Sequence, residues 1–545
     1  MIDVFIAKKI LTMNPSWPIA TAVAVRDGSI LEVGTLESLQ PWLKDTPYRI
    51  REEFTDAVIM PGLIDPHLHP VMAAVLLPMQ FITALPWDLP WGSTAATVTP
   101  EAYLDALHAH AQGDEPFFTW GYHRHWHGEL DRACLDSIFG DRPAVVWQRS
   151  FHELYMNSAM MSHVGIEADQ VRGRPQIDYD RGHFFENGLG YAINKLNPII
   201  MSPAWIDTGL ERLKLIVHHG GQTTVGDMAV GLFDVDLERA ATARVLDNAD
   251  TPFRVLCVPH IRRLLGAGGT PEAGIRALEE FRASSTEKFR FTNKVKMFTD
   301  GAFFSQLAVL QPPGYIDGHL GEWLMGPEEF EKAARAYWHA GCEIHVHCTG
   351  DLGLELALDT LATLQWERPR FEHGFTIEHF GFSTPEQVER ILALGARVSA
   401  NVYYLHELSA AYSEIGVGVE RSHQMARLGA CERAGVRTAL HSDFPMAPAM
   451  PLHSAWVAVT RTNCEGEAVG PQERISIEKA LRSITIDAAA MLGLENETGS
   501  IRAGKKADFA VLDGDPLQGD GTQLKSIRIL ATVFEGDVHP IQHDA

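Results

Sequence analysis

Alternating strand and helix patterns through the middle of the chain, with strand patterns at both ends, predict an α/β fold. The architecture we expect is a (β/α)8 TIM barrel joined to a small β-sandwich built from both termini, with an insertion after the first barrel strand. The predicted ranges are 1–58 for the N-terminal part of the sandwich, 59–495 for the barrel, about 70–223 for the insertion within it, and 496–545 for the C-terminal part of the sandwich.

Both ends of the chain show strand patterns. The N-terminal segment has short runs of alternating apolar residues, and the Asp27-Gly28 pair suits a tight hairpin turn between two of them. Runs 507–512 and 527–534 continue the pattern near the C-terminus, separated by a stretch rich in Gly and Asp. Two such short segments can form one sandwich only if the middle of the chain folds back between them.

The middle of the chain alternates apolar runs with amphipathic helices. The predicted strands are 225–227, 253–258, 295–298, 344–347, 375–377, 396–399 and 438–440. The predicted helices are 271–281, 327–339, 354–364 and 385–394. Regular alternation gives parallel strands with crossover helices, and at this length a closed barrel is the expected form. An open doubly wound sheet is the alternative, but no Gly-rich phosphate-binding sequence follows an early strand.

The stretch from 70 to 223 interrupts this alternation and is rich in Trp, His and Pro. We expect it to cover the mouth of the barrel. Its aromatic side chains either wall an apolar pocket or pack within the insertion. The tryptophans concerned are Trp87, Trp91, Trp120 and Trp126, and Trp126 is a candidate for contact with substrate.

Composition and charge exclude several functional classes. The 545 residues carry 46 Lys+Arg against 70 Asp+Glu, and a net charge of −24 repels phosphate backbones and anionic lipid. No apolar run reaches the ~18–20 residues that span a bilayer, and the first residues lack the order of a signal peptide. The six cysteines show no CxxC spacing. We therefore expect a cytoplasmic protein with a small-molecule substrate and no nucleic-acid or membrane partner; a homo-oligomer such as a dimer is compatible with the sequence.

The densest chemical signal is the apolar run that ends in His67-Leu68-His69. Side chains at i and i+2 of a strand face the same way, so His67 and His69 can bind one ion from the end of a strand. Such a pair is weak evidence alone. Three further strands end in similar residues, with His345 and His347 on one, His379 on another, and Asp443 after the last. Barrel active sites are assembled from strand carboxyl ends, so the set together predicts a metal site.

At this point the sequence resembles the amidohydrolase superfamily. Residues 61–69 are similar to its "PG-x-x-D-x-H-x-H" signature, and residues 499–508 are similar to its closing "GS-x-x-x-GK-x-AD" signature. Intermediate motifs narrow the resemblance to amidohydrolase family 3 and its branch of N-substituted formamide deformylases. The matching pieces are 220–227, 295–301, 347–351, 377–379 and 442–443. The chain departs from relatives at 305–308, where they usually carry Ser-Arg-Thr-Ala, and this leaves the substrate open.

The resemblance implies a (β/α)8 barrel joined to a small β-sandwich, and a role for each matching position. His67 and His69 would bind one divalent metal, zinc by expectation, and His347 and His379 the same ion or a second one. Lys296 would bridge two ions as a carboxylated lysine; the alternative is a one-metal site with Lys296 as a hydrogen-bond donor to substrate. Asp443 would be both a ligand and the proton shuttle.

The chemistry expected of these residues is hydrolysis. A bound zinc ion lowers the pKa of its water towards ~7 and polarises a carbonyl oxygen, and imidazole suits that ion. Asp443 would take the proton of the attacking water and deliver it to the departing nitrogen. Without its partners, Asp443 would be interpreted as a helix N-cap before Phe444-Pro445. His345 and His441, two residues before His347 and Asp443, would support the ligands from deeper in the barrel.

Other histidines have competing interpretations. His152 begins a stretch similar to the branch's "H-x-x-x-x-NS" segment, so contact with substrate is expected. His123, His125 and His127 alternate as a metal site would, but no carboxylate or thiolate cluster accompanies them. Lining a substrate cleft and ordinary packing are the alternatives. Glu186 falls where relatives often carry Glu, and no role is assigned to it.

The leading functional hypothesis is a metal-dependent hydrolase that cleaves a C–N bond, amide or formamide-like, in a small organic molecule. A metal-dependent deaminase of a heterocyclic amine is the first alternative, because fold does not fix chemistry. A non-catalytic binding or regulatory relative is the second. That alternative predicts lost ligands, whereas the chain keeps every expected one: His67, His69, His347, His379 and Asp443.

Overall fold

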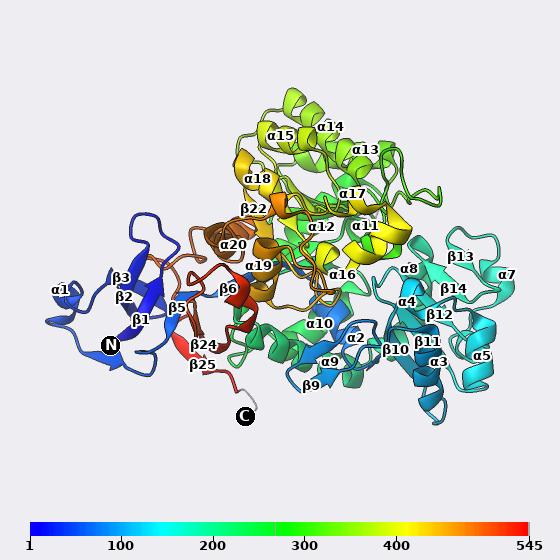
Figure 1. The fold of residues 1–545 in the computed structure, drawn as a ribbon, viewed down its shortest axis with the longest axis horizontal. Coiled ribbons are helices and arrows are strands. Elements are labelled where there is room, and N and C mark those ends of the chain that lie inside the picture. Colours follow the sequence, from blue (N-terminus) through cyan, green and yellow to red (C-terminus); the bar gives the residue numbers. More distant parts are fainter. Residues whose placement is uncertain (267–268, 543–545) are drawn as a thin grey trace.

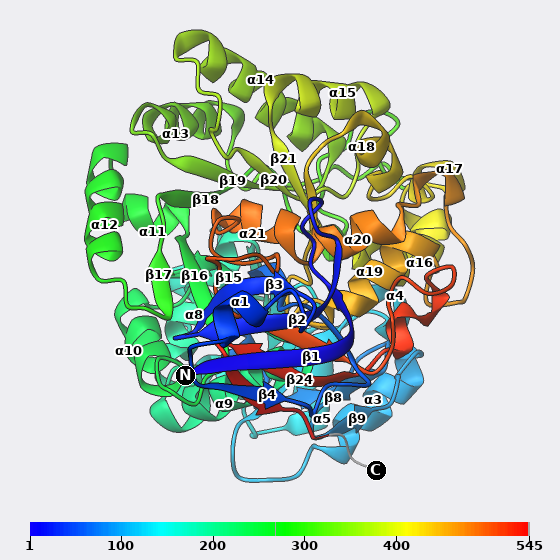
Figure 2. The ribbon, with the colours of Figure 1, turned by 90° about the vertical axis from the view of Figure 1, so that its left-hand side faces the viewer.

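Strands from both ends of the chain form one sheet in the computed structural model, which describes residues 1–266 and 269–542. The sheet has eight strands in the order β25-β24-β23-β5-β1-β2-β3, with β4 paired to β1 (Figures 1 and 2). Its strands are β1 (Ile2–Leu11), β2 (Ile19–Arg26), β3 (Ser29–Gly34), β4 (Tyr48–Arg51), β5 (Val58–Pro61), β23 (Phe509–Leu512), β24 (Ile529–Phe534) and β25 (Asp537–Pro540). The antiparallel pairing of β5 with β23 brings the two ends together.

Local sequence explains this sheet. Asp27 and Gly28 connect β2 to β3 with positive φ angles of 52° and 73°, which a two-residue hairpin turn requires, so the predicted turn is confirmed. Side chains alternate along β1, with Phe5 in one buried cluster and Val4 in another. The helix α1 (Gln40–Leu43) contributes Leu43 to the second cluster.

Two parallel sheets form the middle of the molecule. One has the order β17-β16-β15-β6 and the other the order β18-β19-β20-β21-β22. Their strands are β6 (Leu63–Leu68), β15 (Gln222–Val230), β16 (Arg254–Pro259), β17 (Phe289–Phe291), β18 (Lys294–Phe298), β19 (Glu343–Cys348), β20 (Thr376–His379), β21 (Arg397–Ala400) and β22 (Thr438–Leu440). Every pair within them is parallel, so the predicted strands and their direction are confirmed.

Several helices lie between these strands. They are α10 (Val235–Val245), α11 (Ile261–Gly266), α12 (Pro271–Ala283), η1 (Phe303–Ser305), α13 (Pro327–His339), α14 (Asp351–Glu367), α15 (Pro385–Leu394), α16 (Tyr403–Ala411), η2 (Tyr412–Gly416), α17 (Val419–Ser422) and α18 (Leu428–Ala434). Four of them, α12, α13, α14 and α15, correspond to the predicted ones. After β22 come α19 (Pro451–Thr460), η3 (Pro471–Glu473), α20 (Ile477–Ser483), α21 (Ile486–Leu492) and η4 (Thr522–Ser526). None of the helices among the described residues is long and apolar enough to cross a membrane.

The edges of the two parallel sheets approach one another. His260, which follows β16, forms a parallel bridge with Lys296 of β18. At the other edge the Asp443 N–H, after β22, donates to the His67 carbonyl of β6 at 3.0 Å. Both contacts lie near the carboxyl ends of the strands, so these ends gather around one region.

The segment between β6 and β15 has a sheet of its own, which the sequence analysis did not predict. Its order is β13-β14-β12-β11-β10-β7, and it forms the lobe at the lower right of Figure 1. The strands are β7 (Gln80–Phe81), β10 (Phe117–Tyr122), β11 (Ala144–Gln148), β12 (Glu153–Met156), β13 (Ile177–Asp178) and β14 (His183–Phe185), with a separate hairpin of β8 (Trp87–Leu89) and β9 (Gly92–Thr94). Its helices are α2 (Pro70–Leu76), α3 (Pro100–Ala109), α4 (Arg124–His127), α5 (Arg132–Phe139), α6 (Ser158–His163), α7 (Ala168–Val171), α8 (Asn187–Ile200) and α9 (Pro203–His219).

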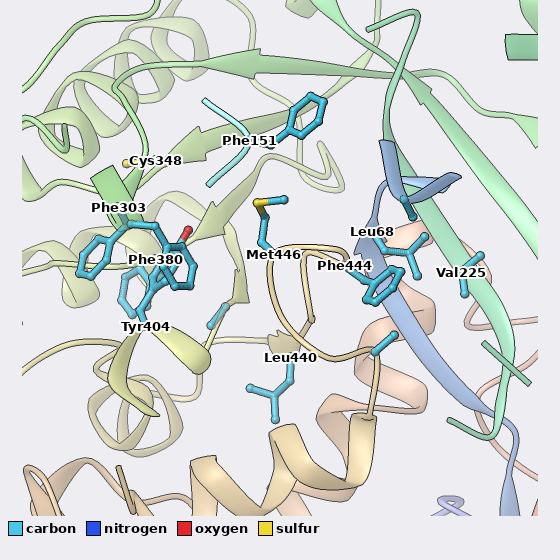
Figure 3. Packing of buried hydrophobic residues seen from close by; sticks show 14 of the residues in the cluster. Leu68, Phe151, Val225, Phe303, Cys348, Phe380, Tyr404, Leu440, Phe444 and Met446 are labelled. Carbon is cyan, nitrogen blue, oxygen red and sulfur yellow. The ribbon is translucent and has the colours of Figure 1, made fainter. Parts of the chain in front are cut away.

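The insertion and the parallel sheets share one hydrophobic core. Figure 3 shows Phe151 of the insertion, Met446 of the loop after β22 and Leu68 of β6, which belong to the same buried cluster. Trp120 and Trp147 of the insertion are fully buried members of it. Continuous packing of this kind holds the insertion in a fixed position over the strand ends.

A buried ion pair joins the terminal sheet to β16. Arg254 donates from Nη1 to Asp508 Oδ2 at 2.6 Å and from Nη2 to Oδ1 at 3.2 Å, and the two side chains are 2% and 0% exposed. Glu535 accepts from the same guanidinium at 3.0 Å. Asp508 is the last residue of the closing signature, so that motif fastens the C-terminal strands to the parallel sheet.

We expect Asp508→Ala to destabilise the protein by about 3–5 kcal/mol, because it leaves the Arg254 guanidinium buried with an incomplete set of partners. The midpoint of urea unfolding measures this. Asp513→Ala is the matched control, since its pair with Arg528 is largely exposed and contributes only about 0–1 kcal/mol. Equal midpoint shifts for the two variants would contradict a structural role for the buried pair.

Candidate metal centre

The six side chains predicted to hold metal line one cavity. This cavity has a volume of about 140 Å³ and lies where the parallel strands end. The predicted residues on its wall are His67, His69, Lys296, His347, His379 and Asp443. They come from β6 and the residue that follows it, from β18, β19 and β20, and from the loop after β22.

Asp443 stands at the meeting point of these side chains. Its Oδ1 lies 3.0 Å from His69 Nε2 and 3.4 Å from His67 Nε2, and its Oδ2 lies 3.7 Å from His379 Nδ1. The next helix, α19, has Met450 at its N-cap, so the interpretation of Asp443 as a helix cap is wrong. The carboxylate instead faces the imidazoles, as a ligand or a proton acceptor would.

Two groups of possible ligand atoms occur around His67. His67, His69 and Asp443 form one group, and His67, His379 and His441 form the other, each with its ligand atoms within 4.8 Å of one another. Lys296 Nζ lies 3.5 Å from His67 Nε2. The ring of His347 lies 4.4 Å from that of His379, centroid to centroid, so it borders the second group. His441 thus lies closer to the ligands than its expected supporting role suggested.

Unusual backbone angles at His379 and Asp443 orient their side chains towards the other candidate ligands. His379 and Asp443 have positive φ angles of 72° and 58°, which are rare for residues other than glycine. Neighbouring side chains of a regular strand face opposite sides, yet Glu378 and His379 both contact His67. The turn at His379 ends the alternation and brings both side chains to the same place.

Glu378 is a functional residue that the sequence analysis missed. It is fully buried, and its carboxylate accepts from His67 Nδ1 at 2.7 Å and from His345 Nδ1 at 2.6 Å. Burial alone would raise its pKa, but the hydrogen bond and charge of His345, with the charge of Lys296, lower the pKa below the ordinary value. A carboxylate on Nδ1 leaves the other ring nitrogen of His67 free to bind a metal.

Asp65 holds the loop that carries Asp443. Its carboxylate accepts the backbone N–H groups of His67 and Ser442, each at 3.3 Å, and also binds the Ser442 hydroxyl. Burial raises the pKa of Asp65 to about 7. The aspartate of the first signature thus positions the HxH strand against the Asp443 loop.

The electrostatics of the cavity suit a divalent ion of the zinc type. Burial holds the pKa of His67, His347 and His379 well below the ordinary value, so these imidazoles are neutral and keep a lone pair for a metal. Burial also lowers the pKa of Lys296 to about 8. His69 Nδ1 is a buried nitrogen without a hydrogen-bond partner among the described residues. Imidazoles with a carboxylate are a donor set that zinc prefers, so the residues present fit the expected metal.

The histidines of α4 lie elsewhere. His123 Nδ1 accepts from the His125 N–H at 3.2 Å, and His127 Nδ1 accepts from the His123 N–H at 3.0 Å. His127 Nε2 lies 2.8 Å from the Thr97 carbonyl. Trp126 packs edge to face against His123, with 4.5 Å between the ring centroids, and none of these four side chains lines the metal cavity. Their contacts are those of local packing.

The other insertion residues singled out by the sequence lie in the core, at the surface or on the cavity wall. Trp87 and Trp120 are buried and pack edge to face at 5.3 Å, whereas Trp91 is 42% exposed. His152 and Glu186 both line the cavity. His152, which was expected to contact substrate, therefore lies beside the proposed metal ligands. The sequence analysis assigned no role to Glu186.

The parallel sheets, with neutral imidazoles and a carboxylate gathered at the strand ends, define a metal-dependent hydrolase. The chain belongs to the amidohydrolase family, whose sequence model matches residues 55–539, and the predicted resemblance is confirmed.

Comparisons with known proteins agree. The chain is 26% identical to protein LONG AFTER FAR-RED 3 of Arabidopsis thaliana, covering 97% of this chain and 89% of that protein. It is 24% identical to N-substituted formamide deformylase of Arthrobacter pascens, covering 95% and 94%. Among solved structures, an uncharacterized metal-dependent hydrolase from Pyrococcus horikoshii has a similar fold, with a TM-score of 0.72 at 22% identity over 96% of this chain and 99% of that one.

Proposed function

We propose that this protein hydrolyses a C–N bond, amide or formamide-like, in a small and partly apolar molecule. The observation that carries the proposal is the position of Asp443, whose carboxylate contacts His69 and borders His67 and His379 in one cavity. A relative named for the removal of formyl groups from substituted formamides supports the choice of bond. The complete set of expected ligands argues against a non-catalytic relative.

The residues divide the work of hydrolysis among them. His67, His69, His347 and His379, with Lys296 and Asp443, would hold one or two ions, which when bound activate water and polarise a carbonyl oxygen. Asp443 accepts the proton of the attacking water and delivers it to the departing nitrogen, because its carboxylate lines the cavity beside His69. Apolar side chains exclude bulk water and contact the remainder of the substrate: Met72, Phe151, Leu189, Leu232, Phe298, Leu324 and Met446.

A substrate panel tests the proposal. N-formyl amines, N-acyl amines, carboxylic esters and aminated heterocycles are incubated with the zinc-loaded protein, and amine, acid and ammonia are measured. Release of an amine together with formate or another carboxylic acid is expected. Ammonia release from a heterocycle, with no amide cleaved, would favour the deaminase alternative and overturn the proposal.

The proposal also covers the architecture, the metal and the location of the protein. The two parallel sheets act as one closed (β/α)8 barrel, and the terminal strands as a β-sandwich beside it, which the edge contacts of β16 with β18 and of β6 with β22 support. The resident metal is zinc. The protein acts in the cytoplasm. It takes its substrate from solution, because a net charge of −24 repels anionic lipid and nucleic acid.

Lys296 is proposed to be a carboxylated bridge between two ions. A lysine ammonium next to divalent cations is disfavoured by like-charge repulsion, and Lys296 is 1% exposed and 3.5 Å from a ring nitrogen of His67. The neutral amine adds CO₂ and loses a proton, which gives a carbamate with the charge of a carboxylate.

We expect Lys296→Ala to lose one of two metal ions per chain, as measured by mass spectrometry of the metals. Bicarbonate during expression should raise the activity of the wild type and leave the variant unchanged. A ratio of one metal per chain in fully active wild-type protein would contradict the bridge and favour a one-metal site.

A further inference from the structure

His152 and Glu186 of the insertion form a hydrogen-bonded pair beside the metal centre. His152 Nδ1 lies 2.8 Å from Glu186 Oε2, and both residues line the metal cavity. The Glu186 N–H also donates to the His152 carbonyl at 2.8 Å, so the main chain and side chains of the pair are both joined. A carboxylate only accepts hydrogen bonds, so His152 Nδ1 donates in this pair. When His152 is the doubly protonated imidazolium, the contact with Glu186 is an ion pair and Nε2 carries a proton as well.

Glu186 has a strained backbone conformation. Its φ and ψ are 45° and −115°, in a region that residues with a side chain seldom occupy. Its side chain is 1% exposed, and Oε1 has no hydrogen-bond partner among the described residues. A Cβ atom added at Gly301 would lie only 3.1 Å from this oxygen, so the loop after β18 packs closely against the carboxylate. The strained backbone of Glu186 and its buried, unpaired Oε1 together indicate that this residue has a function.

The pair leaves the other ring nitrogen of His152 available to a molecule in the cavity. Nδ1 is occupied by Glu186, and Nε2 has no protein partner among the described residues. The His152 side chain is 26% exposed, and its ring lies 6.0 Å from that of His347. His152 therefore lies beside a proposed metal ligand on the wall of the same cavity.

We propose that His152, as the imidazolium of its ion pair with Glu186, donates a hydrogen bond from Nε2 to the acyl oxygen of the substrate, and that Glu186 is the positioning residue that orients it. This inference rests on the proposed hydrolysis of an acyl bond at the metal centre. Water adds to the acyl carbon, the carbonyl π electrons move to the oxygen, and the hydrogen bond stabilises the charge that develops there. The proton of the water reaches the departing nitrogen through Asp443 as the C–N bond breaks, so His152 transfers no proton.

The test compares His152→Asn, Glu186→Gln and the double variant with Glu153→Gln. Glu153 is the matched control because it pairs with His183 at the same 2.8 Å within the same sheet, and neither lines the cavity. We expect kcat to fall about 10²-fold in His152→Asn and about 10-fold in Glu186→Gln, with KM little changed. The double variant should be no slower than His152→Asn, and the control should match the wild type.

Two further measurements separate a positioning role from a structural one. Metal content and the midpoint of thermal unfolding should be unchanged in Glu186→Gln, whose side chain has the shape of glutamate without its charge. In protein labelled with ¹⁵N-histidine, the proton of His152 Nδ1 should resonate far downfield, disappear in His152→Asn and move upfield in Glu186→Gln.

The outcomes distinguish this inference from the proposed function. Rates are measured on whichever amide, formamide or ester the wild type cleaves fastest, since all three carry an acyl oxygen. Cleavage of esters alone would overturn the proposed C–N specificity while the His152 variants still decide the inference. A rise in KM with unchanged kcat, or additive losses in the double variant, would overturn the role of the pair.

Discussion

Replacing His67 by alanine is expected to remove the bound metal and reduce hydrolysis to the background rate, while the parallel sheets stay folded. His67 belongs to both groups of ligand atoms, so its loss disrupts each of them. The core beneath it consists of residues such as Leu68 and Val225, whose packing does not depend on an ion. Glu378 keeps His345 as a partner in the variant, so its buried carboxylate is not left unpaired.

Metal analysis and circular dichroism on the same sample check this expectation. His123→Ala is the control, because its ring lies outside the cavity, and its metal content should equal that of the wild type. Full metal occupancy in His67→Ala would remove His67 from the ligand set. A loss of metal in the control would return the histidines of α4 to consideration as a metal site.

Asp443→Asn should lower kcat by ~10²-fold or more, because an amide keeps the shape of the carboxylate but cannot accept the proton of water. The geometry supports a direct effect, since Asp443 Oδ1 lies 3.0 Å from His69 Nε2 within the cavity. Rates are expressed per bound metal, so that loss of a ligand and loss of a proton acceptor are separated. An unchanged kcat per bound metal would make Asp443 a ligand without a proton-transfer role.

Sequence patterns predicted the strand ends well, for a physical reason. In parallel sheets the strands finish at a common edge, so a histidine or aspartate after an apolar run can be placed without knowing the fold in detail. His67, His347, His379 and Asp443 were found in this way, and all four line one cavity. The hairpin at Asp27-Gly28 was equally predictable, because only a few residues tolerate two positive φ angles in succession.

Contacts between distant segments were not predictable in this way. Glu378 was overlooked because alternation assigns it to the face opposite His379, and only the positive φ of His379 brings both to His67. The link between Glu378 and His67 crosses 311 positions of sequence. Within the sheet of the insertion, β7 and β13 could not be found from the sequence because they are two residues long, too short for a periodic pattern.

Metal depletion and restoration test the central claim most directly. The purified wild-type protein is assayed with an N-formyl amine, treated with a chelator, assayed again, and then supplied with zinc, with metal content measured at each step. We expect at least one metal ion per chain at the start, loss of amine release after chelation, and its recovery with zinc. Full amine release from protein that holds no metal would contradict the assignment of this cavity as a hydrolytic metal centre.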